Sequence, residues 1–422
     1  MLYIILNPGI LYVLVWLTVL SLYQFQYSLL LLPITETAFF FVVASCCSFY
    51  LPTLFKSLIT KKRFTKRRKL ISVDFQAKTK GIFLFWLFFS VIEIIVARNL
   101  PLFGVLGLGP YVRYTDFGIP TLHGLLNACL LVLSNYSLYR YLERKSKKDI
   151  ILWALFLLWG ILKLGRQLIM SQFIQSTFIL LYYLKDNSFD LHRLKQRIIK
   201  LNYNVTKYII PSRNLDSTFK ISKSNFYWFL RIFIGFICLV FLFDAIGNSR
   251  NVDGGLITSI GRASPEYPQF LPSGIFWIYL YITSPLSNVI NNIDFIEPNY
   301  LPLNIISSLT PSAIIDILGL TTNNNYDWQL VVKFLNVNTF HASFLLDFGM
   351  YISLCVYFLM SLLFQSIYLR SLKSRLVCWR FINVVILHNI VLSIFVNFFT
   401  HIVFIAQIII HFFLQYKKHK LK

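Results

Sequence analysis

Arg166 lies inside a run of the sequence, residues 155–181, that is otherwise almost entirely apolar. An ionisable side chain in such a run costs at least ~2.5 kcal/mol on membrane-insertion scales, so it normally faces a bundle interior or a water-filled cavity. Lys163 lies three residues earlier, on the same helical face if the helix continues. The two residues predict a positive pocket at a membrane boundary, and the alternative is an internal ion pair with Glu93 or Asp244.

Three more arginines lie in segments where basic residues are otherwise rare, namely Arg113, Arg250 and Arg262. A guanidinium group presents a planar fork that holds a phosphate through two parallel hydrogen bonds, and it stays charged when buried. Glycines beside Arg250 and Arg262 allow the backbone to approach a ligand closely. We interpret these three residues and Arg166 as candidate phosphate-binding groups; the alternative is that each pairs with a nearby acid.

Four titratable residues near the same predicted boundary are candidates for proton transfer: His123, His341, Asp253 and Glu266. Each histidine lies close to the start of an apolar run, and both acids lie in a long polar segment between such runs. A general base must lie within hydrogen-bond reach of the proton that it takes. All four remain candidates, and the alternative for each histidine is a packed polar side chain inside a helix.

Aromatic residues cluster in a short apolar segment, residues 275–282, which lies between two prolines, the second being Pro285. The segment is too short to span a membrane, which takes about 20 residues, so it predicts an interfacial or re-entrant helix. The rings of Tyr279, Tyr281 and Trp277 are suited to stacking on sugar rings. They are equally suited to an ordinary aromatic belt at the membrane interface.

The composition of the whole chain defines the setting of these residues. Of 422 residues, 57% are hydrophobic and only 14% are charged, whereas soluble domains have about 25% charged residues. A soluble protein of this size could not bury so much apolar surface, because its outer shell must be largely polar. The composition excludes an ordinary cytosolic enzyme, a disordered chain and a disulfide scaffold, and predicts an all-α, polytopic integral membrane protein.

Apolar runs predict about ten transmembrane helices in a single membrane domain, residues 1–422. Two longer segments interrupt the pattern: residues 247–344 form a long loop between the seventh and eighth spans, and residues 185–226 form a basic loop with a surface helix. The predicted spans are 9–28, 37–56, 81–97, 119–139, 150–164, 168–184, 227–246, 345–367, 381–398 and 401–416. The fifth and sixth spans are expected to form a tight hairpin around Gly165 and Arg166.

The net charge of +23 is distributed so that it indicates an orientation. Basic residues concentrate in segments that fall on one side of the ten-span topology, which predicts a cytoplasmic side with both termini on it. The long loop 247–344 then lies on the other side of the membrane. The charge is accounted for by topology and by an anionic inner leaflet, so no nucleic-acid partner is expected. The basic segments are 56–80, 140–149, 185–226, 368–380 and 417–422.

Signals for metals and cofactors are weak in this sequence. The six cysteines lie in or beside apolar stretches, and no C-x-x-C pair or His/Cys cluster has the spacing of a zinc site. There is no Walker motif and no glycine-rich nucleotide fingerprint. We therefore expect no cofactor and no metal in the reaction.

Four stretches of the sequence resemble the polymerases of O-antigen and capsule repeat units, the Wzy-type family. They are GIPTLHG at 118–124, the Gly165–Arg166 turn, WIYLYITSPLSN at 277–288, and NVNTF at 336–340 followed by Asp347, Phe348 and Gly349. About ten spans, one long outer loop and sparse outer arginines are also similar to that family. The topological resemblance covers nearly the whole chain, and the four stretches cover less than a tenth of it.

The resemblance implies a GT-C-like membrane glycosyltransferase in the bacterial inner membrane, acting at its periplasmic face. Its substrates would be oligosaccharide repeat units carried on undecaprenyl pyrophosphate, both as donor and as acceptor, and its product O-antigen or capsular polysaccharide. A chain-length regulator and a flippase of the same pathway are implied partners besides the lipid bilayer. No nucleotide sugar would be needed.

The candidate residues fit such a reaction. Arginine donors in a site of low dielectric constant would stabilise the pyrophosphate leaving group; we assign Arg166, Arg250 and Arg262 to it, with Arg113 as the fourth candidate. The acceptor hydroxyl would need one of the four proton acceptors named above. Two other functions remain open: a ligase that transfers the finished glycan to a lipid A core, and a non-enzymatic flippase or transporter of lipid-linked oligosaccharide.

Overall fold

A computed structural model describes residues 2–60, 76–114, 116–206, 257–268, 270–310, 314–315, 328–374 and 376–416. Within these ranges the chain is helical, with one isolated antiparallel bridge between Ser28 and Ala263. The helices are α1 (Leu2–Ile5), α2 (Pro8–Tyr23), α3 (Glu36–Thr60), α4 (Gln76–Ala97), α5 (Pro101–Val105), α6 (Leu122–Arg144), α7 (Lys147–Leu162), α8 (Arg166–Thr206), α10 (Ile257–Ile260), α11 (Ser273–Ile290), α12 (Leu303–Leu309), α14 (His341–Lys373), α15 (Cys378–Leu392), the 3-10 helix η1 (Phe398–Thr400) and α16 (Ile402–Tyr416). The predicted span 227–246 lies outside the described residues, as do Arg250 and Asp253.

Three of the described helical segments are long and apolar enough to cross a membrane: Glu36–Phe55, Thr79–Val105 and His341–Lys373. Shorter apolar helices accompany them at Pro8–Tyr23, Cys378–Leu392 and Ile402–Leu414. The helical fold and these segments are compatible with a membrane protein, and the count of ten spans stays a prediction.

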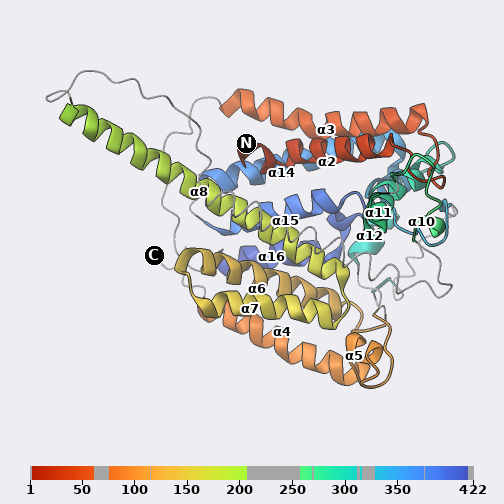
Figure 1. Cartoon of the computed structure of the whole chain (residues 1–422), viewed down its shortest axis with the longest axis horizontal. Helices are drawn as coiled ribbons and strands as arrows, with labels where there is room; N and C mark the ends of the chain where they lie inside the picture. Colours follow the sequence, from red (N-terminus) through yellow and green to blue (C-terminus); the bar gives the residue numbers. More distant parts are fainter. Residues whose placement is uncertain are drawn as a thin grey trace.

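The long helices form one bundle that runs from α3 at one side to α4 at the other (Figure 1). Aromatic side chains fill the half of the bundle that contains α2, α3 and α14; the rings of Tyr12 and Phe49, for example, stack with centroids 3.8 Å apart. A smaller core, which includes Trp86, Leu130 and Phe156, joins α4, α6 and α7. Helix α4 packs at the edge of the bundle, and few of its residues are buried.

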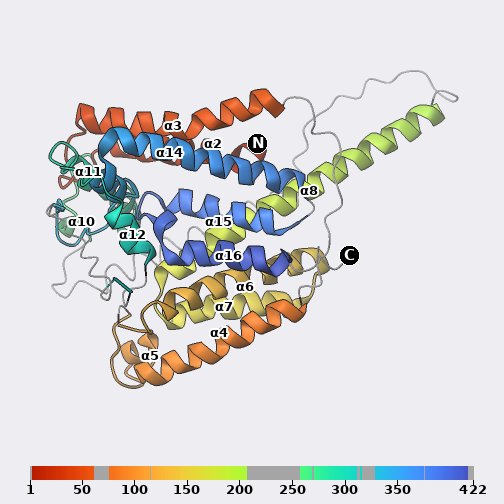
Figure 2. The ribbon, with the colours of Figure 1, turned by 180° about the vertical axis from the view of Figure 1, so that it is seen from behind.

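The two ends of the bundle differ in what they carry. The chain termini and the α6–α7 turn lie at one end, and α5, α10, α11 and α12 lie at the opposite end in both views (Figures 1 and 2). We call the latter the loop end. The candidate residues that the structure describes all belong to segments at the loop end.

The predicted hairpin between the fifth and sixth spans is confirmed. Helix α7 ends at Leu162, Leu164 has a positive φ of 52°, and the Gly165 amide donates to the Gly160 carbonyl at 2.9 Å before α8 begins. The helix does not continue from Lys163 to Arg166, so these two residues do not share a helical face. Helix α8 then runs for 41 residues to Thr206, so residues 185–206 of the predicted basic loop continue this helix.

Helix α11 is longer than its sequence indicates. Pro285 was expected to end the apolar helix, because proline lacks the amide hydrogen that a helix interior requires. Instead α11 passes through Pro285 to Ile290. The buried Asn288 side chain explains the extension, since its amide donates to the Leu335 and Val337 carbonyls at 2.8 and 3.0 Å. These tertiary contacts outweigh the local preference of proline.

Candidate functional site

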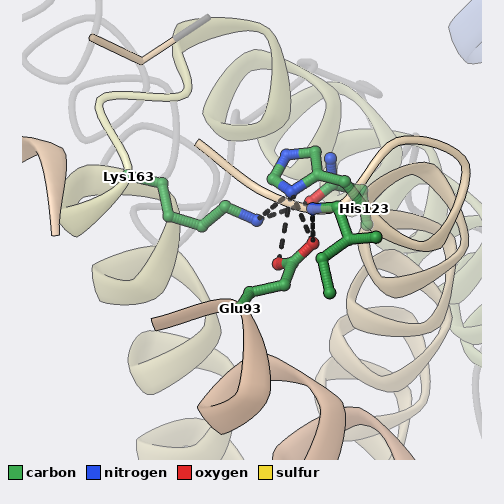
Figure 3. Close-up of polar contacts among 5 residues, drawn as sticks. Glu93, His123 and Lys163 are labelled. Atoms are coloured by element: carbon green, nitrogen blue, oxygen red, sulfur yellow. Dashed lines mark hydrogen bonds and ion pairs between the residues drawn. The ribbon is translucent and has the colours of Figure 1, made fainter. Parts of the chain in front are cut away.

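A cluster of three ionisable side chains lies at the loop end between α4, α6 and the α7–α8 turn (Figure 3). Nδ1 of His123 lies 3.0 and 3.2 Å from the two carboxylate oxygens of Glu93. Nζ of Lys163 lies 3.5 Å from the same ring nitrogen and 3.1 Å from Oδ1 of Asn127. We call Glu93, His123 and Lys163 the charged cluster.

Helix geometry places the charged cluster just inside the end of the bundle. Glu93 lies four residues before the last residue of α4, which corresponds to about 6 Å along a helix. His123 is the second residue of α6, and Lys163 follows the last residue of α7. Three helix ends that are distant in sequence therefore bring one acid and two bases together at one depth.

The segment before α6 is shaped to hold Glu93 and His123. The Ile119 amide donates to Oε1 of Glu93 at 3.2 Å, so the carboxylate accepts from backbone and ring alike. Gly118 has a φ of +107°, and a Cβ at this position would lie 2.2 Å from Nδ1 of His123 and 2.9 Å from Oε1 of Glu93. Only glycine fits, because it tolerates this φ and leaves the space that the two side chains occupy.

Burial sets the electrostatics of the charged cluster. The Glu93 side chain is fully buried, and Lys163 is buried with its ammonium group 5.5 Å from the ring centre of Phe117. Lys163 lies in the turn after α7. An acid and a basic side chain buried together offset each other, which limits the cost of burying both.

The arrangement orients the imidazole for proton transfer. A carboxylate that accepts from Nδ1–H fixes the tautomer in which Nε2 carries the lone pair, and it stabilises the imidazolium that forms when Nε2 takes a proton. The His123 side chain is 29% exposed, so a substrate group can approach the ring. His123 therefore has both a partner that orients it and access from outside.

His341, the other histidine candidate, lies in a different environment. It is fully buried against the rings of Trp16 and Phe41, with centroids 4.6 and 5.0 Å away, and its Nδ1 lies 3.0 Å from the Tyr357 hydroxyl. Among the described residues, no carboxylate contacts this imidazole. The alternative reading of a packed polar side chain describes this geometry.

The remaining predicted residues lie on separate segments of the loop end. Arg113 is exposed between α5 and α6, and Arg166 is the half-buried first residue of α8. Arg262 is exposed, and its carbonyl accepts from the Leu29 amide at 2.9 Å beside the Ser28–Ala263 bridge. Glu266 is exposed nearby. Joint binding of one phosphate group by these arginines stays a prediction.

The two tyrosines differ in how far they are engaged in packing. Tyr279 is buried, its hydroxyl accepts from the Tyr27 amide at 3.1 Å, and the two rings lie 5.3 Å apart. Tyr281 is half-buried against the edge of Trp277, with ring centres 5.1 Å apart. Tyr279 thus fastens the α2–α3 connection to α11, and Tyr281 has more ring surface available to a ligand.

The sequence predicted that Lys163 forms a positive pocket with Arg166, and it offered Glu93 only as an alternative ion-pair partner. The roles of Asn127 and Gly118 were not predicted. The sequence did contain a signal for the pair. Glu93 lies about one turn before the end of the predicted span 81–97, and His123 lies about one turn after the start of the next span, 119–139, so both are at the same predicted membrane boundary. Two polar residues at one depth in neighbouring apolar helices favour contact with each other.

A second carboxylate, Asp347, is also fully buried at the loop end. It accepts hydrogen bonds from the amides of Asn304 and Ile305, both at 3.0 Å, and from the Asn304 side chain at 2.7 Å. Helix α14 breaks its regular geometry at Gly349, two residues later. Asp347 therefore holds α12 against α14, which is a structural role.

Within the part of the chain that the structure describes, no group of three or more His, Cys, Asp or Glu side chains is arranged to hold a metal ion. Compared with known proteins, the chain matches no family model, no curated protein and no solved structure.

Proposed function

We propose that the chain is a membrane glycosyltransferase that polymerises oligosaccharide repeat units carried on undecaprenyl pyrophosphate. The observation that carries the proposal is the pairing of Glu93 with a partly exposed His123 at the end of an apolar bundle. A general base at this depth suits a substrate whose reacting sugar is tethered to a lipid. The GIPTLHG stretch that supplies Gly118 and His123 is also one of those that resemble the Wzy-type polymerases.

In the proposed reaction, the acceptor hydroxyl gives its proton to Nε2 of His123 while its oxygen bonds to the anomeric carbon of the donor. The bond from that carbon to the pyrophosphate oxygen breaks, and the electron pair leaves with undecaprenyl pyrophosphate. Glu93 orients the ring and stabilises the imidazolium. Arg166, Arg250 and Arg262 are assigned to the negative charge that develops on the leaving group.

The proposed setting is the bacterial inner membrane, with the loop end in the periplasm and both termini in the cytoplasm. Two observations support it. The termini lie at the end of the bundle opposite the charged cluster (Figures 1 and 2). The α6–α7 turn, which belongs to a basic segment, lies at the same end as the termini, as expected when basic residues stay in the cytoplasm.

The proposal is tested with the purified full-length protein in proteoliposomes that contain one lipid-linked repeat unit. A ladder of glycan lengths is the expected result. Products that appear only when a lipid A core acceptor is added would identify a ligase instead. If neither addition gives a longer glycan in a preparation that retains its helical structure, the transferase proposal is wrong.

The charged cluster also favours a second function, a proton-coupled flippase or transporter of lipid-linked oligosaccharide. Buried Glu and His side chains in membrane helices commonly form proton relays in transporters, and Glu93 contacts His123 directly. This function predicts that a fluorescent lipid-linked oligosaccharide moves across the membrane of sealed vesicles in response to an imposed pH gradient, with no change in glycan length. Glycan elongation without such movement favours the transferase.

A further inference from the structure

Apolar side chains project outward from the connection between α4 and α6. We call residues 98–114, which include α5, the α5 loop. Six of its large apolar or aromatic side chains are between 37% and 69% exposed: Phe103, Val105, Leu106, Leu108, Tyr111 and Tyr114. An exposed apolar patch of this density on a short segment must be covered by a lipid bilayer or by another protein.

The α5 loop holds these side chains outward through its own hydrogen bonds. The Asn99 side chain donates to the Pro110 carbonyl at 2.8 Å and closes the base of the loop. At the tip, the Leu108 amide donates to the Phe103 carbonyl at 2.8 Å, and Gly107 adopts a positive φ of 72°. The exposure of Leu108 is therefore built into the turn.

Helix length places the loop at a membrane surface. The apolar part of α4, residues 79–97, has a length of about 28 Å at 1.5 Å per residue, close to the ~30 Å hydrocarbon core of a bilayer. The outward face of α4 is apolar up to its end, where Ile95 and Val96 are 68% and 63% exposed. The apolar segment continues through this point to Val105. Helix α4 leads directly into the α5 loop (Figures 1 and 2), so its exposed apolar face continues into the exposed side chains of the loop.

The polar residues of the loop suit the headgroup layer. Arg98 and Arg113 are exposed and flank the apolar tip, with Tyr111 and Tyr114 beside Arg113. Tyrosines concentrate at membrane–water interfaces, and arginines there place their charged heads near lipid phosphates.

We propose that the α5 loop is an interfacial membrane anchor whose tip enters the acyl–headgroup boundary and whose Arg98 and Arg113 bind the phosphates of anionic lipids. The loop leads from Glu93 to Gly118 and His123, so its seating in the membrane sets the depth of the charged cluster. This inference does not rest on the proposed function, since it holds for a transferase and a transporter alike.

The depth of the tip is the first test. The full-length chain, with its six cysteines replaced by serine, receives one cysteine in place of Leu106 or Leu108 and a nitrobenzoxadiazole label. In nanodiscs, doxyl-labelled lipids should quench both probes as strongly as a probe at Leu87 on the exposed face of α4. Iodide in the water should quench them far less than a probe at the exposed Asp294.

The arginines are tested with the same probes. Quenching by doxyl-labelled phosphatidylglycerol should exceed quenching by doxyl-labelled phosphatidylcholine, and the apparent preference should fall about fivefold for Arg98→Gln and again for Arg113→Gln. Arg144→Gln, at the other end of the bundle, is the matched control and should leave it unchanged.

Three results would overturn the anchor. Strong iodide quenching without lipid quenching would place the tip in water. Protection from both quenchers would mean that protein, such as a second copy of the chain, covers it. Equal quenching by the two lipids, unaffected by either arginine variant, would remove the phosphate contacts. Activity is not measured in any arm, so failure here leaves the transferase proposal standing.

Discussion

His123 and His341 lie at the same end of the same bundle, yet their surroundings differ in two respects. His123 contacts a carboxylate and is 29% exposed. His341 contacts a hydroxyl and is fully enclosed by rings that include Trp16 and Phe340. One histidine is oriented and accessible, whereas the other is oriented and sealed.

The comparison shows what separates a catalytic candidate from a packing residue when both are histidines near the end of an apolar run. A carboxylate partner stabilises the protonated ring, while an aromatic enclosure disfavours any charge. Access decides whether a substrate can deliver a proton. Each of the following substitutions breaks or sharpens this contrast, starting with the largest expected effect.

The same substitution at both histidines gives the most direct test. We expect His123→Gln to lower glycan elongation by about 10²- to 10⁴-fold, the usual contribution of a general base. His341→Gln should leave the rate per folded molecule unchanged and lower the thermal midpoint, because a buried ring is lost from a packed core. Elongation assays and thermal unfolding of both variants measure this. Equal loss of activity per folded molecule in the two variants would show that His123 is not the base that distinguishes the site from the packed His341.

Glu93 should act through His123 as a positioning residue. We expect Glu93→Gln to lower elongation on the order of 10²-fold, less than removal of the base itself, because the amide no longer stabilises the imidazolium. A change in the pH–rate profile should accompany the loss, and Glu93→Asp should restore part of the rate. An unchanged profile with lower protein stability would indicate a purely structural carboxylate.

Gly118 offers a matched pair with Gly107. Both have a positive φ, but a Cβ at Gly107 meets nothing within 4 Å, whereas one at Gly118 meets His123 and Glu93. Displacement of a catalytic group by ~1 Å can cost on the order of 10²-fold in rate, so we expect such a loss for Gly118→Ala. Gly107→Ala carries the backbone strain alone and should retain the rate. Similar activity in the two variants would show that the space at Gly118 is not needed to position His123 and Glu93.

Lys163 should give the smallest effect. Its ammonium group lies 3.5 Å from Nδ1 of His123 and 3.1 Å from Oδ1 of Asn127, so it contributes a positive charge to the charged cluster without orienting the ring as Glu93 does. We expect Lys163→Met to lower glycan elongation by several-fold at most, measured in the same elongation assay. A loss as large as that of His123→Gln would contradict this ranking.

Local signals predicted the helices well where they act within one turn of the chain. Gly165 follows an apolar run and precedes a charged residue, which is enough to predict the α7–α8 hairpin. Pro285 failed as a stop signal because the contacts of Asn288 come from residues about 50 positions away. A surface helix was predicted within residues 185–226, and the structure has helix there up to Thr206. That this helix continues α8 without a break was not predicted, since polar composition marks no junction between a buried and an exposed helix.

The candidate site was predictable only in part for the same reason. The sequence identified His123 as polar and close to a boundary. Its contact with Glu93 joins residues 30 positions apart, and it depends on how α4 and α6 pack, which no local pattern specifies. The role of Gly118 depends on that contact in turn, because the space beside its Cα is occupied by the side chains of His123 and Glu93, which come from two different helices.

Helix α8 has a mechanical consequence. It is a single rod of 41 residues that begins at Arg166 beside the α7–α8 turn and extends past the far end of the bundle (Figures 1 and 2). At about 60 Å in length, a tilt of one degree about its first turn displaces its last turn by ~1 Å. A small tilt at the loop end would thereby become a larger displacement at the far end of the helix.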